Sequence, residues 1–199
     1  MIQPAERLNL VSEYYFSRKL KEVARLNAQG LDIISLAIGS PDMPPSEQTV
    51  SKLCEVARRP DAHGYQPTMG TPELRQAMAA FYQRWYDVHL DPAREILPLI
   101  GSKEGILHVT LAFVNPGDAV LVPNPGYPTY TSLSKILGAN VVSYGLKAGE
   151  GWQPDFGELE QLAGREELQC KLLWTNYPNM PTGAPARRET YERLLDFAR

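Results

Sequence analysis

The chain has 199 residues, of which 43% are hydrophobic and 22% are charged, as is ordinary for a globular protein. Its formal net charge is -3, and Lys and Arg are spread along it rather than gathered in runs. The composition therefore argues against nucleic acid or a membrane surface as a partner. Two cysteines, Cys54 and Cys170, do not make a disulfide framework, so we expect buried free thiols in a reducing compartment.

The N-terminal residues MIQPAERLNL do not combine a basic stretch with an apolar core, so no secretory signal is expected. The most apolar stretch, residues 96–114, is interrupted by polar and charged side chains, which argues against a membrane span. We therefore expect a cytoplasmic protein.

The first 90 residues contain patterns of both helices and strands. Apolar periodicity and capping residues predict the following elements in this part of the chain: a helix over 16–29 closed by Gly30, a strand over 33–38, a helix over 47–58, and a helix that begins at Thr71 and Pro72.

Beyond residue 96, strands and helices alternate. The predicted strands are 97–100, 119–122, 140–144 and 171–176, and the predicted helices are 106–114, 130–137, 155–162 and 186–198. Such alternation indicates βαβ units and hence an α/β fold with a mainly parallel sheet covered on both faces. Four strands are fewer than a whole sheet usually has, and no strand follows the last helix. We therefore expect this α/β domain to be truncated.

The first chemical signal is Gly101-Ser102-Lys103-Glu104-Gly105, at the predicted junction of a strand and a helix. Backbone N–H groups and the helix dipole make such a junction an anion site, to which Ser102 adds a hydroxyl and Lys103 a positive charge. It also lies at a strand's carboxyl end, where open α/β sheets bind ligands. The alternative is a plain turn in which serine caps the helix.

Two further loops also follow predicted strands. In the segment PGYPTY, Tyr127 stands on a proline-flanked turn and could present its ring to a flat heteroaromatic ligand, or could simply pack in the core. In the segment NYPNMPTGA, Asn176 and Asn179 could donate hydrogen bonds to a ring hydroxyl or a carboxylate. Taken alone, that second segment is equally consistent with an ordinary loop.

In their order along the chain, five segments resemble the class I/II aminotransferases, which are fold-type I enzymes dependent on pyridoxal 5′-phosphate (PLP). The segments are SLAIGSPDMPP, HGYQPTMGTPELRQAMAAFY, GSKEGI, NPGDAVLVPNPGYPTY and NYPNMPTGAP. The resemblance runs from about Tyr14 to the last residue and is nearest to the diaminopimelate-aminotransferase-like branch. It implies a three-layer αβα large domain over 41–199, preceded over 1–40 by a segment of the small domain.

The resemblance also implies roles for individual residues. It assigns the cofactor phosphate to Ser102, Lys103 and Glu104, and the face of the pyridine ring to Tyr127. Asn176 and Asn179 match the loop beside the ring. Tyr65 matches a tyrosine that reaches the phosphate of the partner subunit in a homodimer, and Gly39 and Tyr14 match substrate-binding positions.

Two departures from the family pattern affect the expected activity. Met180 stands where the family usually has an asparagine bonded to the oxygen on the ring, and methionine cannot donate a hydrogen bond. The family's Schiff-base lysine, the aspartate at the ring nitrogen and the carboxylate-binding arginine all match positions beyond residue 199. We therefore expect no catalytic residue in this chain and no turnover by it alone.

By this resemblance, the parent enzyme would transfer an amino group between an amino acid and a 2-oxo acid, as a homodimer without nucleic acid or membrane partners. Two alternatives stay open. The first is another enzyme of the same fold, such as a carbon–sulfur lyase, a decarboxylase or an acyl-transfer enzyme. The second is a non-catalytic module of this fold. His63, His89 and His108 do not show metal-ligand spacing, so no metal is expected.

Overall fold

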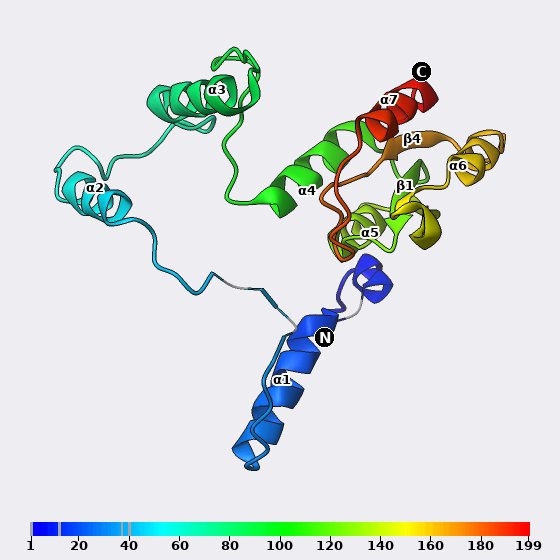
Figure 1. Ribbon diagram of the computed structural model, residues 1–199, viewed down its shortest axis with the longest axis horizontal. Coiled ribbons are helices and arrows are strands. Elements are labelled where there is room, and N and C mark those ends of the chain that lie inside the picture. The colour runs from blue at the N-terminus through cyan, green and yellow to red at the C-terminus, as the bar shows by residue number, and fades with distance from the viewer. Residues whose placement is uncertain (1, 12, 37, 40) are drawn as a thin grey trace. The chain divides into compact units, whose positions relative to one another are not determined.

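The computed structural model describes residues 2–11, 13–36, 38–39 and 41–199. The chain divides into two compact units (Figure 1). The first unit comprises residues 1–12 and 101–199, and the second comprises residues 13–100.

The first unit is built on a four-stranded sheet with the strand order β3-β2-β1-β4. Its strands are β1 (Ala119–Asn124), β2 (Asn140–Lys147), β3 (Gln153–Pro154) and β4 (Cys170–Leu173). The central strand β1 pairs in parallel with both β2 and β4, whereas the short β3 pairs antiparallel with β2. The prediction of a mainly parallel sheet is thus confirmed.

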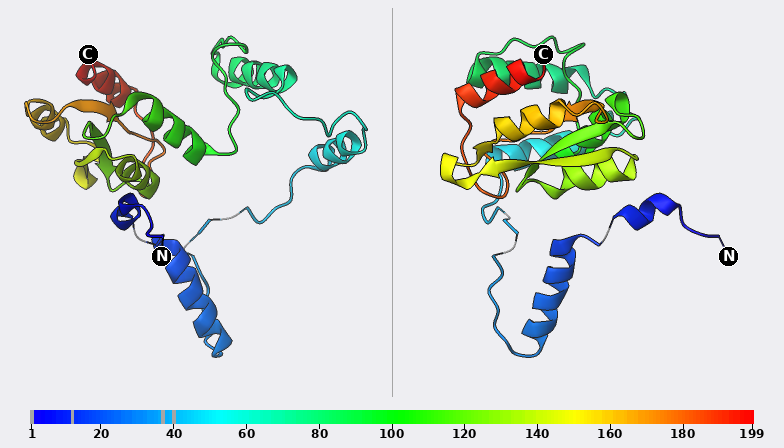
Figure 2. Two further views of the ribbon diagram at one scale, coloured as in Figure 1. Left: turned by 180° about the vertical axis from the view of Figure 1, so that it is seen from behind. Right: turned by 90° about the vertical axis from the view of Figure 1, so that its right-hand side faces the viewer.

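Helices surround this sheet (Figure 2). They are α4 (Ser102–Phe113), α5 (Pro128–Ile136), α6 (Phe156–Ala163) and α7 (Arg188–Phe197). The unit also contains two short 3-10 helices, η1 (Glu6–Leu10), which contacts α5, and η2 (Ala148–Glu150). The sequence predicted α4 to α7 to within a few residues of these bounds. The N-cap of α6 is Asp155, whose side chain accepts a hydrogen bond from the backbone N–H of Glu158 at 3.2 Å.

Two apolar clusters hold the layers of this unit together. Leu121 of β1 packs with Leu159 of α6 and Leu194 of α7, whereas Val120 and Val122 of the same strand pack with Ile106 of α4. Successive side chains of a strand point to opposite faces, so α6 and α7 cover one face of the sheet and α4 and α5 cover the other. The unit is therefore the predicted three-layer αβα arrangement.

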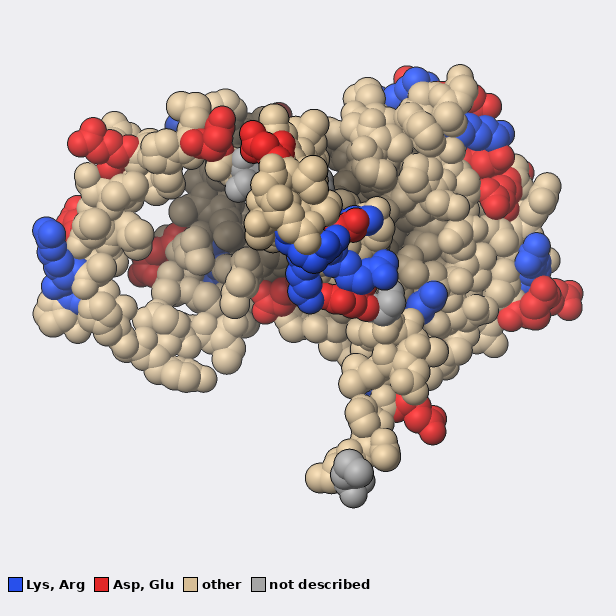
Figure 3. Space-filling model, turned by 90° about the horizontal axis from the view of Figure 1, so that it is seen from below, with Lys and Arg blue, Asp and Glu red and all other residues tan. Residues whose placement is uncertain are grey.

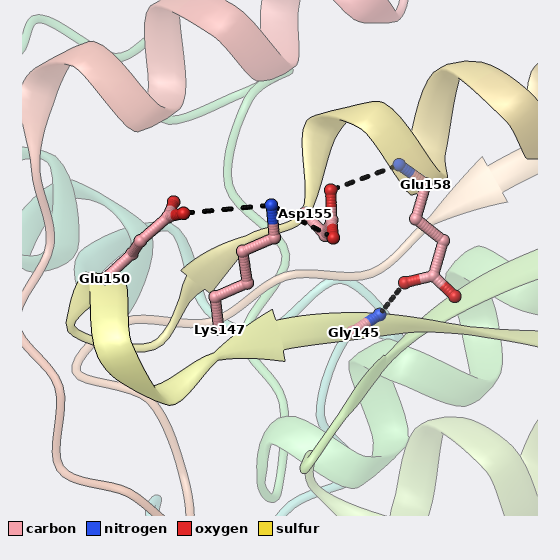
Figure 4. A network of polar contacts seen from close by, with 5 residues as sticks. All are labelled: Gly145, Lys147, Glu150, Asp155 and Glu158. Carbon is pink, nitrogen blue, oxygen red and sulfur yellow. Dashed lines mark hydrogen bonds and ion pairs between the residues drawn. The ribbon is translucent and has the colours of Figure 1, made fainter.

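A polar network closes the edge of β2 beside β3 (Figure 4). The carboxylate of Glu158 accepts a hydrogen bond from the backbone N–H of Gly145 at 2.6 Å, and the Gly145 carbonyl accepts one from the backbone N–H of Asp155 at 2.9 Å. Lys147 lies 3.1 Å from the Asp155 carboxylate and 3.7 Å from that of Glu150. The two hydrogen bonds to Gly145 pair backbone groups that the two-residue strand β3 is too short to reach, and the Lys147 ion pairs join side chains beside them.

The second unit carries three helices, α1 (Tyr15–Ala28), α2 (Glu47–Ala57) and α3 (Pro72–Tyr86). The side chain of Thr71 caps α3 by accepting from the backbone N–H of Leu74 at 3.3 Å, with Pro72 in the first turn, as predicted. Gly30 adopts a φ of 86° just after α1, in agreement with its expected role as a helix stop. None of the described residues of these three helices is buried within the chain.

The predicted apolar face of α3 is present but largely exposed. Phe81 and Trp85 are 50% and 64% exposed. Part of this face borders an apolar groove of about 660 Å³ that Met78, Leu90 and Ile96 also line. The periodicity therefore correctly indicated a helix, but the apolar face that it marks is not buried within the chain.

Several sequence predictions were wrong. Residues 97–100 and 33–36 do not form strands, and Ile100 is fully exposed. Among the described residues of the second unit, no strand lies beside either segment, and an extended segment without a ladder partner gains little from its backbone polar groups. Ala37, in the second predicted strand, lies outside the described residues. Strand β3 was missed because two residues are too few to show periodicity.

Three other expectations concern the cysteines, the surface and the domain boundary. Cys54 and Cys170 are exposed, so the expectation of buried thiols was wrong: Cys54 is on the uncovered α2, and Cys170 begins β4. On the face seen in Figure 3, basic and acidic side chains are interspersed. No described helix is both long enough and apolar enough to cross a bilayer. The division at residue 40 falls beside Ser40, outside the described residues, and stays a prediction.

Candidate functional site

The candidate site lies in the first unit, at the carboxyl ends of the parallel strands. Asn124 ends β1 and Leu173 ends β4, and because these strands are parallel, the loops that follow them leave the same edge of the sheet. The loop after β1 carries Tyr127, and the segment after β4 carries Asn176. Helix α4, which begins at Ser102, packs against the same sheet.

Lys103 and Tyr127 are brought together by the fold. The Lys103 ammonium lies 6.0 Å from the centroid of the Tyr127 ring, although the two residues belong to different helix starts. Gly101 is the N-cap residue of α4 and no described side chain caps that helix, so Ser102 does not cap it as the plain-turn alternative required. The first turn of α4, which carries the positive end of the helix dipole, therefore lies close to an aromatic ring.

The backbone before Tyr127 is closely fitted. A Cβ atom on Gly126 would lie 2.2 Å from the carbonyl oxygen of Pro123, so only glycine fits there without a shift of backbone. Pro128 then opens α5, with Tyr127 as its N-cap residue at a φ of -68°. Gly101, by contrast, has an extended φ and open space around its Cβ position, so the left-handed conformation that favours glycine is not used there.

Asn179 has a structural part in the loop after β4. It is 3% exposed, and its side-chain oxygen accepts hydrogen bonds from the hydroxyl of Thr182 at 2.8 Å and from that residue's backbone N–H at 3.4 Å. Gly183, at a φ of 73°, donates from its backbone to the Asn179 carbonyl at 2.7 Å. The oxygen of this amide is therefore used to shape the turn that leads toward α7.

The side-chain oxygen of Asn176 lacks a hydrogen-bond donor among the described residues. Its side-chain amide donates to the carbonyl of Pro178 at 3.3 Å, but its side-chain oxygen is buried and finds no partner among the described residues. The same holds for the indole N–H of Trp174. A buried polar atom without a partner is costly, so the Asn176 oxygen, in the loop at the strands' carboxyl ends, suits a ligand that completes its hydrogen bond. Met180, close by in sequence, is 42% exposed.

The other predicted residues have different surroundings. Glu104 lies in the first turn of α4, with its carboxylate 3.5 Å from the imidazole of His108. Tyr14, Gly39 and Tyr65 belong to the second unit, where Tyr65 is 98% exposed and Tyr14 lies 5.5 Å from Phe16 between ring centroids. A Cβ atom on Gly39 would not meet any described atom within 4 Å.

Sequence reasoning missed two aromatic residues beside Tyr127. The ring of Tyr130 meets Tyr127 edge-on at 5.8 Å between centroids and is stacked on Trp174 at 5.0 Å with an interplanar angle of 13°. Burial raises the pKa of Tyr130, and the neighbouring Tyr127 adds to this shift. The spacing of the two tyrosines, three residues apart at a helix start, was the signal that could have revealed their contact.

Comparison with known proteins shows the family of the chain. A profile of the family described as "Aminotransferase class I and II" matches residues 31–199. The chain belongs to the aminotransferase class I and II family. It is similar to LL-diaminopimelate aminotransferases of Moorella thermoacetica, at 43% identity over 198 residues, and of Dehalococcoides mccartyi, at 42% over 194 residues. These matches cover 100% and 98% of the chain, but 50% and 49% of the relatives.

Solved structures give the same family. Apo-BacF of Bacillus subtilis is 36% identical with a TM-score of 0.88, and the alanine aminotransferase of Pyrococcus furiosus is 30% identical with a TM-score of 0.86. The first match covers 100% of this chain and 50% of BacF, and the second covers 98% and 49%. The chain thus has about half of an aminotransferase fold and spans about half the length of the relatives it matches.

Proposed function

We propose that the first unit of this aminotransferase-family chain holds pyridoxal 5′-phosphate, with its phosphate at the start of α4 and its ring against Tyr127. The observation that carries the proposal is the 6.0 Å approach of the Lys103 ammonium to the Tyr127 ring. A cation beside a helix N-terminus suits a phosphate, and an aromatic ring within reach suits the flat face of a pyridine. One ligand with both groups fits the pair.

The residues of the site would divide the work of holding this cofactor. Ser102 and Lys103 would bind the phosphate by a hydroxyl and a charge, beside Glu104 in the same turn, and Tyr127 would orient the ring and exclude water from one of its faces. The unsatisfied oxygen of Asn176 would accept a hydrogen bond at the edge of the ring. When bound, the cofactor supplies an electron-withdrawing ring that stabilises negative charge on the substrate.

Pyridoxamine 5′-phosphate tests this proposal cleanly, because it lacks the aldehyde that reacts with surface lysines. We expect the chain to bind it about 10-fold or more tightly than pyridoxamine, which lacks the phosphate. Lys103→Met should reduce that preference, while Lys135→Met, which changes an exposed lysine in the last turn of α5, should leave it unchanged. Equal affinities for the two compounds in the unmodified chain would overturn the proposal.

For the whole protein we propose amino transfer between an amino acid and a 2-oxo acid in the cytoplasm, by a homodimer without nucleic acid or membrane partners. Within such a dimer, Tyr65 would reach the phosphate of the partner subunit, and Tyr14 and Gly39 would contact the substrate. The similarity to LL-diaminopimelate aminotransferases supports the reaction class and makes LL-diaminopimelate the first substrate to try.

A chimera tests the reaction itself. This chain would replace the matching half of the Moorella relative, and amino transfer from LL-diaminopimelate to a 2-oxo acid would be followed by product analysis. We expect amino transfer that Tyr127→Ala strongly reduces. Release of ammonia without formation of a new amino acid would instead favour a lyase of the same fold, and cofactor binding without any reaction would favour a non-catalytic module.

A further inference from the structure

The aromatic row, defined as Tyr127, Tyr130 and Trp174, connects the proposed ring site to the core of the first unit. Tyr127, just before α5, is partly buried. Tyr130 is 7% exposed and belongs to the apolar cluster between the sheet and helices α4 and α5. Trp174 packs against the same cluster just beyond the end of β4. The row therefore runs from a surface loop into tightly packed structure.

The inner end of the aromatic row is fixed by backbone hydrogen bonds. The backbone N–H of Trp174 donates to the carbonyl of Leu121 in β1 at 2.9 Å, and the backbone carbonyl of Trp174 accepts from the hydroxyl of Tyr144 in β2 at 2.8 Å. Tyr144 is itself fully buried, and burial raises the pKa of its hydroxyl, so the hydroxyl stays protonated as a donor. Two strands thus hold the backbone that carries the indole.

The outer end depends on this anchor. The Tyr127 ring contacts Tyr130 edge-on and lies near the Lys103 ammonium, and these two contacts limit how the ring can turn. Tyr130 in turn is held by its nearly parallel stack on Trp174. A side chain that loses one ring neighbour gains rotational freedom. Without the Trp174 stack, the Tyr130 ring is therefore held less firmly, and so is the Tyr127 ring that it contacts.

We propose that Trp174 is a positioning residue for the cofactor ring, acting by stacking on Tyr130 and thereby fixing the ring of Tyr127. This inference rests on the proposed function, because it concerns the same site. It separates two tasks within that site. Phosphate binding belongs to the start of α4, and ring orientation belongs to the aromatic row.

The test uses pyridoxamine 5′-phosphate with the complete 199-residue chain and two readouts. The first is the dissociation constant, and the second is the induced circular dichroism of the bound ring per molecule bound, which reports how uniquely the ring is oriented. Trp174→Leu removes the stacking ring, and Trp174→Phe keeps an aromatic stack. Trp85→Phe, on α3 of the second unit, is the matched control.

We expect Trp174→Leu to weaken binding about 2- to 10-fold and to lower the induced signal per bound ring, while inorganic phosphate competes with unchanged affinity. Trp174→Phe should restore most of the signal. Far-ultraviolet circular dichroism checks that the variants are folded. Should Trp174→Leu fail to fold, Tyr130→Leu removes the middle of the row and is expected to lower the same signal.

Two results would overturn the inference in distinguishable ways. If the unmodified chain binds pyridoxamine 5′-phosphate without any preference for the phosphate, both the proposed function and this inference fail. If that preference is present but folded Trp174→Leu or Tyr130→Leu gives an unchanged induced signal, only the positioning role fails. Loss of phosphate competition in the same variants would also contradict it, since it would indicate a general structural effect.

Discussion

The ammonium of Lys103, in the first turn of α4, lies 6.0 Å from the centre of the Tyr127 ring, at the start of α5. The two residues are 24 positions apart in the sequence and meet because both helices pack on the same face of the sheet. Helix starts on one face of a parallel sheet converge at the strands' carboxyl ends. This juxtaposition brings a charge suited to phosphate next to a surface suited to a ring.

The close fit of Gly126 predicts that its substitution disturbs Tyr127. A Cβ atom there would lie 2.2 Å from the Pro123 carbonyl oxygen, so Gly126→Ala must shift the backbone directly before the ring. We expect weaker binding of pyridoxamine 5′-phosphate and a lower midpoint of thermal unfolding. Gly149→Ala is the control, because a Cβ atom there would not meet any described atom within 4 Å. Equal effects of the two substitutions would contradict the prediction.

Met180 offers a gain of function to test. In the family that this chain resembles, an asparagine at this position bonds the ring oxygen, and Met180 is 42% exposed, so the larger side chain is not needed to fill a core. A hydrogen bond to a charged oxygen contributes about 1.5–3 kcal/mol, so we expect Met180→Asn to tighten pyridoxamine 5′-phosphate binding about 10-fold or more. Met69→Asn, at a similarly exposed methionine of the second unit, should have no effect. An unchanged dissociation constant for Met180→Asn would mean that residue 180 does not face the ring oxygen.

The packing of α6 on the sheet predicts which leucine contributes most to the free energy of unfolding. Leu159 is completely buried against Leu121, so Leu159→Ala should lower the free energy of unfolding by about 2–5 kcal/mol. Leu195, on α7, is 61% exposed, and Leu195→Ala should change it by less than about 0.5 kcal/mol. Urea denaturation monitored by circular dichroism measures both. A small effect at Leu159 would contradict the described core.

The ion pair of Asp155 predicts a pH dependence. A hydrogen bond from Lys147 lowers the pKa of the Asp155 carboxyl below its ordinary value of 3.8. The folded-state pKa is thus below the unfolded one, so the stabilising contribution is present above the unfolded pKa and is lost as pH falls through the folded pKa. We expect Asp155→Asn to be less stable than the unmodified chain near neutral pH and equally stable in sufficiently acidic solution.

The comparison between Asp155→Asn and Asp155→Ala separates charge from capping. Asparagine still accepts the backbone hydrogen bond at the start of α6, whereas alanine loses the cap as well. Asp155→Ala should therefore remain less stable than Asp155→Asn at every pH. Because the Asp155 side chain is partly exposed, added salt should reduce the difference between the unmodified chain and Asp155→Asn. A pH-independent difference would rule out the ion pair as its cause.

Local patterns were sufficient to predict much of the first unit. Residues 119–122 and 140–144 were correctly assigned to strands because each carries apolar side chains and follows a turn, and α4 to α7 follow from their periodicity. Residues 97–100 show the limit of such reasoning. Their apolar run is typical of a strand, but a strand also needs a neighbour, and pairing is a long-range property that a local pattern does not contain.

The candidate site was predicted only in part, because local patterns do not contain long-range contacts. Ser102, Lys103 and Tyr127 stood out because their loops follow predicted strands, and the fold does bring Lys103 and Tyr127 together. Trp174 did not stand out, since its role depends on the stack with Tyr130, 44 positions earlier. Asn179 was predicted as a ligand, and only the structure reveals that its oxygen accepts from Thr182.

The most direct test of the central claim is a crystal structure of this chain with pyridoxamine 5′-phosphate. We expect the phosphate to lie at the first turn of α4, beside Ser102 and Lys103, with the pyridine ring against Tyr127. A phosphate bound elsewhere on the first unit, such as in the pocket that Arg187 and Arg193 line, with Tyr127 not touching the ring, would contradict it.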